Sequence, residues 1–129
     1  LRRAVQSAAS LSFSTGPSGV YLEQLFQRWG ILDEVRPRIV VPPPGIPVGS
    51  LVAEGKAELG FQQLSELMNL PGIDVLGPLP PEIQTLTVFS GGVCAASAAQ
   101  PQARALLEYL ASPATAELKR QHGMAPPRG

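Results

Sequence analysis

Two short stretches of the sequence carry residue types that can hold a small ligand. The first, Thr15-Gly-Pro-Ser-Gly-Val-Tyr21, is a loop of small and hydroxyl residues that opens an expected helix. The second, Gly55-Lys-Ala-Glu-Leu-Gly-Phe-Gln-Gln63, ends an expected buried strand on two amides. Another helix start, Gly45-Ile-Pro47, lies between them. Helix starts expose backbone N–H groups, so these turns predict a ligand site whose first loop contributes Thr15, Ser18 and the amides of Gly19 and Val20.

Each of these features also has a purely structural explanation. Ser18 can serve only as the N-cap of its helix, and Gly45 can serve only as a tight turn after a proline run. Taken alone, each of these two residues is explained better in that way. Gln62 and Gln63 need hydrogen-bond partners, because an unpaired buried polar group costs roughly 1–3 kcal/mol. A ligand, an adjoining domain or a loop of the chain could supply those partners, and the sequence leaves these alternatives open.

No set of residues typical of catalysis or metal binding stands out in the sequence. His122 is the single histidine and lies near the end of the last expected helix, where C-capping or solvent exposure explains it. Cys94 is the single cysteine, so no disulfide framework or thiolate metal site is expected, and its apolar neighbours predict a buried, inert thiol. We therefore expect no cofactor, no metal and no enzymatic activity.

The composition is that of an ordinary globular chain of 129 residues, long enough for one domain with a core. Ten basic and ten acidic residues cancel, which argues against nucleic acid or an anionic membrane as a partner. No apolar run approaches membrane-spanning length. The chain begins with Leu1 rather than methionine, which suggests a piece of a longer protein whose secretion signal could lie outside it.

Expected strands alternate with expected helices, which predicts an α/β fold of three layers with a largely parallel sheet. Apolar periodicity and turn residues place these elements along the chain. Strands are predicted over residues 10–14, 38–41, 57–61, 73–76 and 85–95. Helices are predicted over residues 20–29, 47–54, 63–68, 103–111 and 113–121, with shorter helical turns over 1–9 and 31–35. Residues 78–81 form a rigid, proline-rich bend.

Several runs of residues, in this order, resemble periplasmic substrate-binding proteins of ABC transporters, of the molybdate-binding type. The runs are Ser18-Gly-Val-Tyr-Leu22, Phe26-Gln-Arg-Trp-Gly-Ile31, Leu51-Val-Ala-Glu-Gly-Lys-Ala-Glu-Leu-Gly60, Gly77-Pro-Leu-Pro-Pro-Glu82 and Ala103-Arg-Ala-Leu-Leu-Glu-Tyr-Leu-Ala-Ser-Pro113. The resemblance covers nearly the whole chain. It implies a periplasmic-binding-protein type II-like three-layer sandwich of two lobes. Residues 1–84 would form the second lobe, and residues 85–129 would be the crossover strand and C-terminal helices of a mostly absent first lobe.

The resemblance also implies a function and a set of ligand contacts. The protein would be a periplasmic or otherwise extracytoplasmic receptor that feeds an ABC transporter and binds a small oxyanion or another small polar solute between its lobes. Contacts would fall on Ser18, on Gly45 or Ile46, and on Gln63. Molybdate binders typically carry a tyrosine where this chain has Gln63. The amide reaches less far and adds an acceptor, so we expect it to tune the specificity.

Two further expectations follow from the two-lobe resemblance. A related fold forms the effector-binding domain of transcription regulators, and this alternative stays open: an upstream helix-turn-helix would favour it, and a signal peptide would exclude it. Separately, residues 85–123 would lack part of their native apolar cover. We therefore expect the chain to self-associate, with exchange of the C-terminal segment between two copies as one route and residues 78–81 as the hinge.

Overall fold

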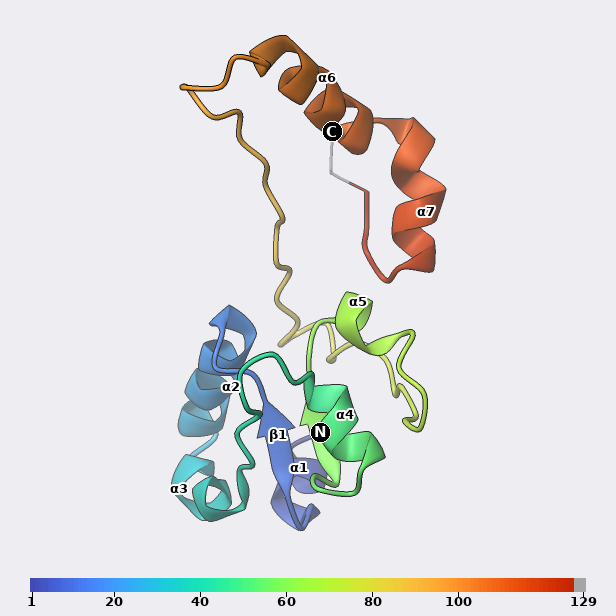
Figure 1. The fold of residues 1–129 in the computed structure, drawn as a ribbon. Coiled ribbons are helices and arrows are strands. Elements are labelled where there is room, and N and C mark those ends of the chain that lie inside the picture. Colours follow the sequence, from blue (N-terminus) through green and yellow to red (C-terminus); the bar gives the residue numbers. More distant parts are fainter. Residues whose placement is uncertain (127–129) are drawn as a thin grey trace. The chain divides into compact units, whose positions relative to one another are not determined.

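The computed structural model describes residues 1–126 and divides the chain into two compact units. The first unit is Leu1–Gly77, and the second begins at Pro78. Within the described residues no helix is both long enough and apolar enough to cross a membrane. The two units are described separately below, with their elements labelled in Figure 1.

The first unit combines short strands with helices, as the sequence predicts for an α/β fold. Its elements are α1 (Arg2–Ser7), β1 (Leu11–Phe13), α2 (Pro17–Arg28), α3 (Leu32–Val35), a 3-10 turn (Arg36–Arg38), α4 (Val48–Ala53), β2 (Leu59–Phe61) and α5 (Leu64–Leu67). Pro17 occupies the first position of α2, where its missing N–H costs nothing. Gly30 and Gly55 follow α2 and α4 with positive φ, a conformation that ends helices readily. These predicted helices are therefore confirmed to within a few residues.

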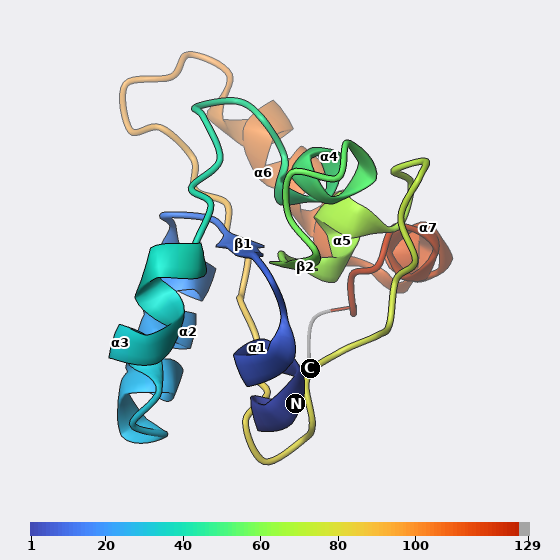
Figure 2. The same cartoon turned by 90° about the horizontal axis from the view of Figure 1, so that it is seen from below.

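β1 is the central strand of the first unit. On one side it pairs in parallel with β2, with Leu11 opposite Leu59. On its other side Leu11 forms a parallel bridge with Ile39. After β1 the chain therefore forms the bridge at Ile39 on one side of this strand, and it later forms β2 on the other side. Figures 1 and 2 show α2 and α4 on opposite sides of β1, which is the layering expected when the direction of winding reverses.

Phe26 forms the centre of the core. It is fully buried, and its ring centroid lies 6.0 Å from that of Phe13, 6.1 Å from that of Trp29 and 6.4 Å from that of Phe61. Aromatic pairs at such distances add to the free energy gained by burial alone. The ring of Phe26 therefore ties α2 to both strands, and it fixes the ends of β1 and β2 relative to each other.

The sequence overstates the number of strands. Residues 38–41 contribute a single bridge, and residues 73–76 and 85–95 form no strand in the part of the chain that the structure describes. A strand exists only when a neighbouring backbone pairs with it. Residues 85–95 include many apolar side chains, but Val88 is 82% exposed and Phe89 is 64% exposed. Cys94 is also exposed, so the expectation of a buried thiol is wrong.

The second unit is built around helices. It contains α6 (Gln100–Ala111), a 3-10 turn (Pro113–Thr115) and α7 (Ala116–Gln121), which confirms the two helices predicted there. The hydroxyl of buried Thr115 donates to the carbonyl oxygens of Leu110 and Ser112 at 2.8 and 3.1 Å, and so fixes the corner between the helices. Leu106 and Leu110 of α6 are exposed. The mixture of helices and strands fits an α/β protein; the type II sandwich and the lobe boundary after residue 84 stay predictions.

Candidate functional site

A hollow of about 270 Å³ lies at the carboxyl end of β1. In open α/β sheets, ligands bind outside the carboxyl ends of strands, at the point where the winding reverses. β1 is that point here, because its two neighbours in the sheet follow it on opposite sides. Three segments bound the hollow: the end of β1, the first turns of α2 and the chain after the bridge at Ile39. The lining residues are Phe13, Ser14, Thr15, Gly19, Val20, Glu23, Ile39 and Val41.

The close approach of α2 to the end of β1 depends on Gly19. A Cβ atom at this position would overlap the carbonyl oxygen of Ser14, so no side chain fits there without a shift of the backbone. Glycine is the residue that allows such contact between two backbones. The absence of a side chain at position 19 therefore places the first turn of the helix directly against the strand end.

The first turn of α2 offers backbone donors to the hollow. Gly16 is the N-cap and has no side chain to bond the free N–H groups of this turn. Ser18 lies within the turn, and its hydroxyl is 3.2 Å from the hydroxyl of Ser14, so the explanation of Ser18 as an N-cap is wrong. A helix start carries a partial positive charge. This wall of the hollow can therefore bind an anionic oxygen.

Glu23 is the ionisable residue among those that line the hollow, and no Lys or Arg is among them. It lies four residues after Gly19 and hence on the same face of α2. Arg38, the cation nearest in sequence to Ile39, is held elsewhere: its guanidinium donates to the carbonyl oxygens of Gln6 at 2.9 Å and of Ala8. The hollow thus combines neutral donors with a single carboxylate.

Comparison with known proteins decides the family. The model of the bacterial extracellular solute-binding proteins matches residues 1–125. The chain belongs to this family. It is also 40% identical over 128 residues to an aconitate isomerase from Pseudomonas sp., an alignment that covers 97% of this chain and 48% of the relative. The chain therefore spans about half the length of this curated relative. No solved structure gives a significant match.

Membership of this solute-binding family confirms the coarse form of several expectations. The family description supports a solute-binding role for a small molecule and a location outside the cytoplasm. The expectation that the protein is not an enzyme is wrong, because a relative at 40% identity is named as an isomerase. That expectation depended on the lack of a recognisable acid/base or nucleophile set in the sequence.

The structure brings together part of the predicted contact set for this solute-binding protein. Thr15 and Gly19 line the hollow, and Ser18 is one hydrogen bond away from it through Ser14. Gly45 and Ile46 are exposed and do not line it. As contacts of a ligand, all of these residues stay predictions.

The two adjacent glutamines separate into different roles. Gln62 accepts a hydrogen bond from the backbone N–H of Val48 at 3.0 Å through its Oε1, and so caps the start of α4. One of the alternatives left open, a hydrogen bond within the chain, therefore explains Gln62. Gln63 directly precedes α5, is half-buried and makes no capping bond with its side chain. It lies outside the lining of the hollow, and its contact with a ligand stays a prediction.

Sequence reasoning missed Phe13, Ser14, Glu23, Ile39 and Val41 as lining residues. The signal for Glu23 was its spacing of four from Gly19, which places both on one helix face. The signal for Ile39 was weaker, because it depends on which strand neighbours β1. A pairing of strands far apart in the sequence cannot be inferred from local periodicity, so this wall of the hollow required the structure.

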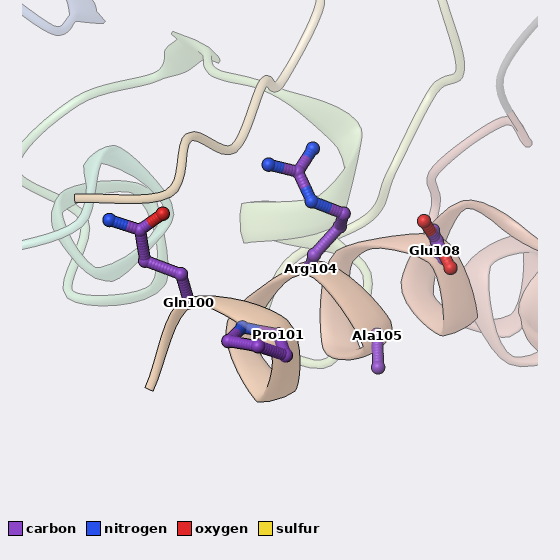
Figure 3. Close-up of a pocket in the computed structure, with 5 residues that line it drawn as sticks. All are labelled: Gln100, Pro101, Arg104, Ala105 and Glu108. Atoms are coloured by element: carbon purple, nitrogen blue, oxygen red, sulfur yellow. The ribbon is translucent and has the colours of Figure 1, made fainter. Parts of the chain in front are cut away.

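A second hollow, of about 390 Å³, lies along α6 in the second unit. Figure 3 shows Gln100 and Arg104 extending to one side of the helix, whereas Ala105 points to the other side. All five lining residues belong to this single helix. A site needs walls that converge on a ligand, so the hollow at β1 is the better candidate.

Proposed function

We propose that the hollow at the end of β1 is part of the binding site for a small polycarboxylate, and that the protein acts on aconitate as an isomerase. The observation that carries this proposal is the 40% identity, over nearly the whole chain, to a protein named aconitate isomerase. Because the chain covers about half of that relative, the activity is proposed for the full-length protein.

The chemistry of the hollow supports a carboxylate as ligand. Aconitate carries three carboxyl groups, and a carboxylate oxygen accepts hydrogen bonds from N–H groups and hydroxyls. The hollow offers the first-turn amides of α2 together with Ser14 and Thr15. Hydrogen bonds to a charged group contribute about 1.5–3 kcal/mol each. Two or three such bonds would hold one carboxylate of the ligand at the helix start.

The test is an assay of the full-length protein with purified cis- and trans-aconitate. Proton NMR separates the olefinic signals of the two isomers, and calorimetry measures the affinity for each and for molybdate and sulfate. We expect interconversion of the isomers and tighter binding of aconitate than of either inorganic anion. Thr15→Ala should weaken binding by about 1 kcal/mol or more, whereas Thr85→Ala, an exposed threonine of the second unit, should not. Absence of both turnover and aconitate binding would contradict the proposal.

A second candidate is a receptor that delivers a small oxyanion to an ABC transporter from the periplasm. It is favoured by the neutral donors at the start of α2, because backbone amides and hydroxyls can select an anion by size and geometry without a counter-ion. In this proposal the chain is part of a type II two-lobe protein, with Ser18, Gly45 or Ile46, and Gln63 as contacts. Gln63→Tyr should then shift preference toward molybdate in a competition titration against sulfate.

We also propose that copies of this chain associate through the segment that follows residue 84. Leu86, Val88 and Phe89 are all more than 60% exposed, and Leu106 of α6 is 57% exposed. Apolar groups exposed together in this way are typical of surfaces that bind another protein. Exchange of the C-terminal segment between two copies would cover them, and sedimentation at low micromolar concentration measures the association.

A further inference from the structure

We infer that Glu23 is the residue that moves the proton in the reaction of this site. The inference rests on the proposed function, because it assigns a role within the isomerisation of aconitate. It goes beyond that function by naming the side chain that performs the chemistry. The structure places Glu23 in the wall of the hollow, one helical turn beyond the close contact between Gly19 and Ser14.

The position of Glu23 suits a group that works on a bound carboxylate. Gly19, Val20 and Glu23 share one face of α2, so the first turn and the carboxylate line the same hollow. A ligand carboxylate held by the helix start and by Ser14 or Thr15 would lie in the same hollow that Glu23 lines, one helical turn from Gly19. Among the residues that line this hollow, Glu23 alone carries a side-chain carboxylate, a group that serves as a general base in many enzymes.

The chemistry of aconitate requires such a group. The acid has a carbon–carbon double bond next to a CH2 group that bears a carboxylate. A base can take a proton from this CH2 group, and the electrons of the broken C–H bond then spread over the three-carbon allyl unit and its carboxylates. Return of the proton to the other end of the unit forms a new C–H bond and moves the double bond. Glu23 is protonated in the first step and deprotonated in the second, so no oxidant, reductant or co-reactant is consumed.

In this arrangement, ligand binding and proton transfer depend on different residues. The helix start and the hydroxyls of Ser14 and Thr15 bind and orient the acid, while Glu23 carries the proton. A positioned acid/base group typically contributes about 10²–10⁴-fold to a rate. Removing the carboxylate should therefore reduce turnover far more than it reduces binding, and this difference separates a catalytic role from a structural one.

The experiment compares Glu23→Gln, Glu23→Asp and the unchanged full-length protein. Glu23→Gln keeps the size and the hydrogen-bonding capacity of the side chain and removes the base. We expect kcat for aconitate to fall about a hundredfold or more, with the dissociation constant changed less than about threefold. Deuterium uptake into aconitate in D2O should fall in parallel. Glu23→Asp should retain part of the turnover and part of the deuterium uptake. Glu66→Gln, an exposed glutamate of α5 outside the hollow, is the matched control and should keep full activity.

The outcomes separate this inference from the proposed function. If the unchanged protein isomerises aconitate and Glu23→Gln does so at the same rate, Glu23 does not move the proton, and the proposed function stands. An equal loss of binding and turnover in Glu23→Gln would assign Glu23 to binding and overturn the inference. If the unchanged protein neither binds nor converts aconitate, the proposed function fails and the inference fails with it. Because Glu23 is exposed, each variant should keep the fold, which circular dichroism checks.

Discussion

The two units of the chain differ in where their apolar side chains lie. In Leu1–Gly77, Phe26 and its aromatic neighbours are packed between a helix and two strands. In the unit that begins at Pro78, Leu86, Val88 and Phe89 are exposed, although the apolar residues of this segment also predict a strand. The difference shows that the spacing of apolar residues predicts which face of an element could be buried. Whether that face is buried depends on another segment packing against it.

The largest expected effect compares a phenylalanine from each unit. Phe26→Ala should reduce the free energy of unfolding by about 3–5 kcal/mol, because it empties the centre of an aromatic cluster. Phe89→Ala should change it by less than about 0.5 kcal/mol, since the side chain is exposed. Urea denaturation followed by circular dichroism measures both, and sedimentation should show weaker self-association of Phe89→Ala. Equal destabilisation by the two substitutions would remove the contrast between the units.

A pair of glycines gives the next effect. Gly19→Ala should destabilise the protein by roughly 1–3 kcal/mol, because the added methyl group overlaps the carbonyl oxygen of Ser14 and must push α2 away from β1. At Gly92 nothing lies within 4 Å of an added Cβ, so Gly92→Ala should leave stability unchanged or slightly raised. The same denaturation curves measure the pair. A tolerated alanine at position 19 would show that α2 does not press against the strand end.

The smallest effect sharpens the comparison within the first unit. Gln62→Ala should cost about 1 kcal/mol, the value of a typical hydrogen bond, because the N–H of Val48 loses its acceptor. The side chain of Gln63, the next residue in the sequence, makes no capping bond. Gln63→Ala should therefore leave thermal stability unchanged. Differential scanning calorimetry of the two variants decides which glutamine belongs to the fold. A larger loss for Gln63→Ala would reverse the assignment.

Much of the fold and part of the site could be predicted from the sequence. The helices were found because apolar spacing, Pro17 and the stop glycines act locally. The loop after β1 was singled out because its small and hydroxyl residues precede a helix. The bridge of Leu11 to Ile39 depends on pairing between distant segments, and so the far wall of the hollow was missed. Glu23 was missed because a single carboxylate on a helix does not stand out in the sequence, and the structure is needed to place it in the lining of the hollow.

The contact between Gly19 and Ser14 has a consequence for the comparison of related chains. The gap between the helix start and the strand end is too narrow for a methyl group, so the shape of the hollow depends on the lack of a Cβ atom at position 19. A homologue with any other residue at this position needs a shift of the helix start or of the strand end to make room for the side chain. The identity of this one residue therefore marks, in any related sequence, whether the two backbones can come this close.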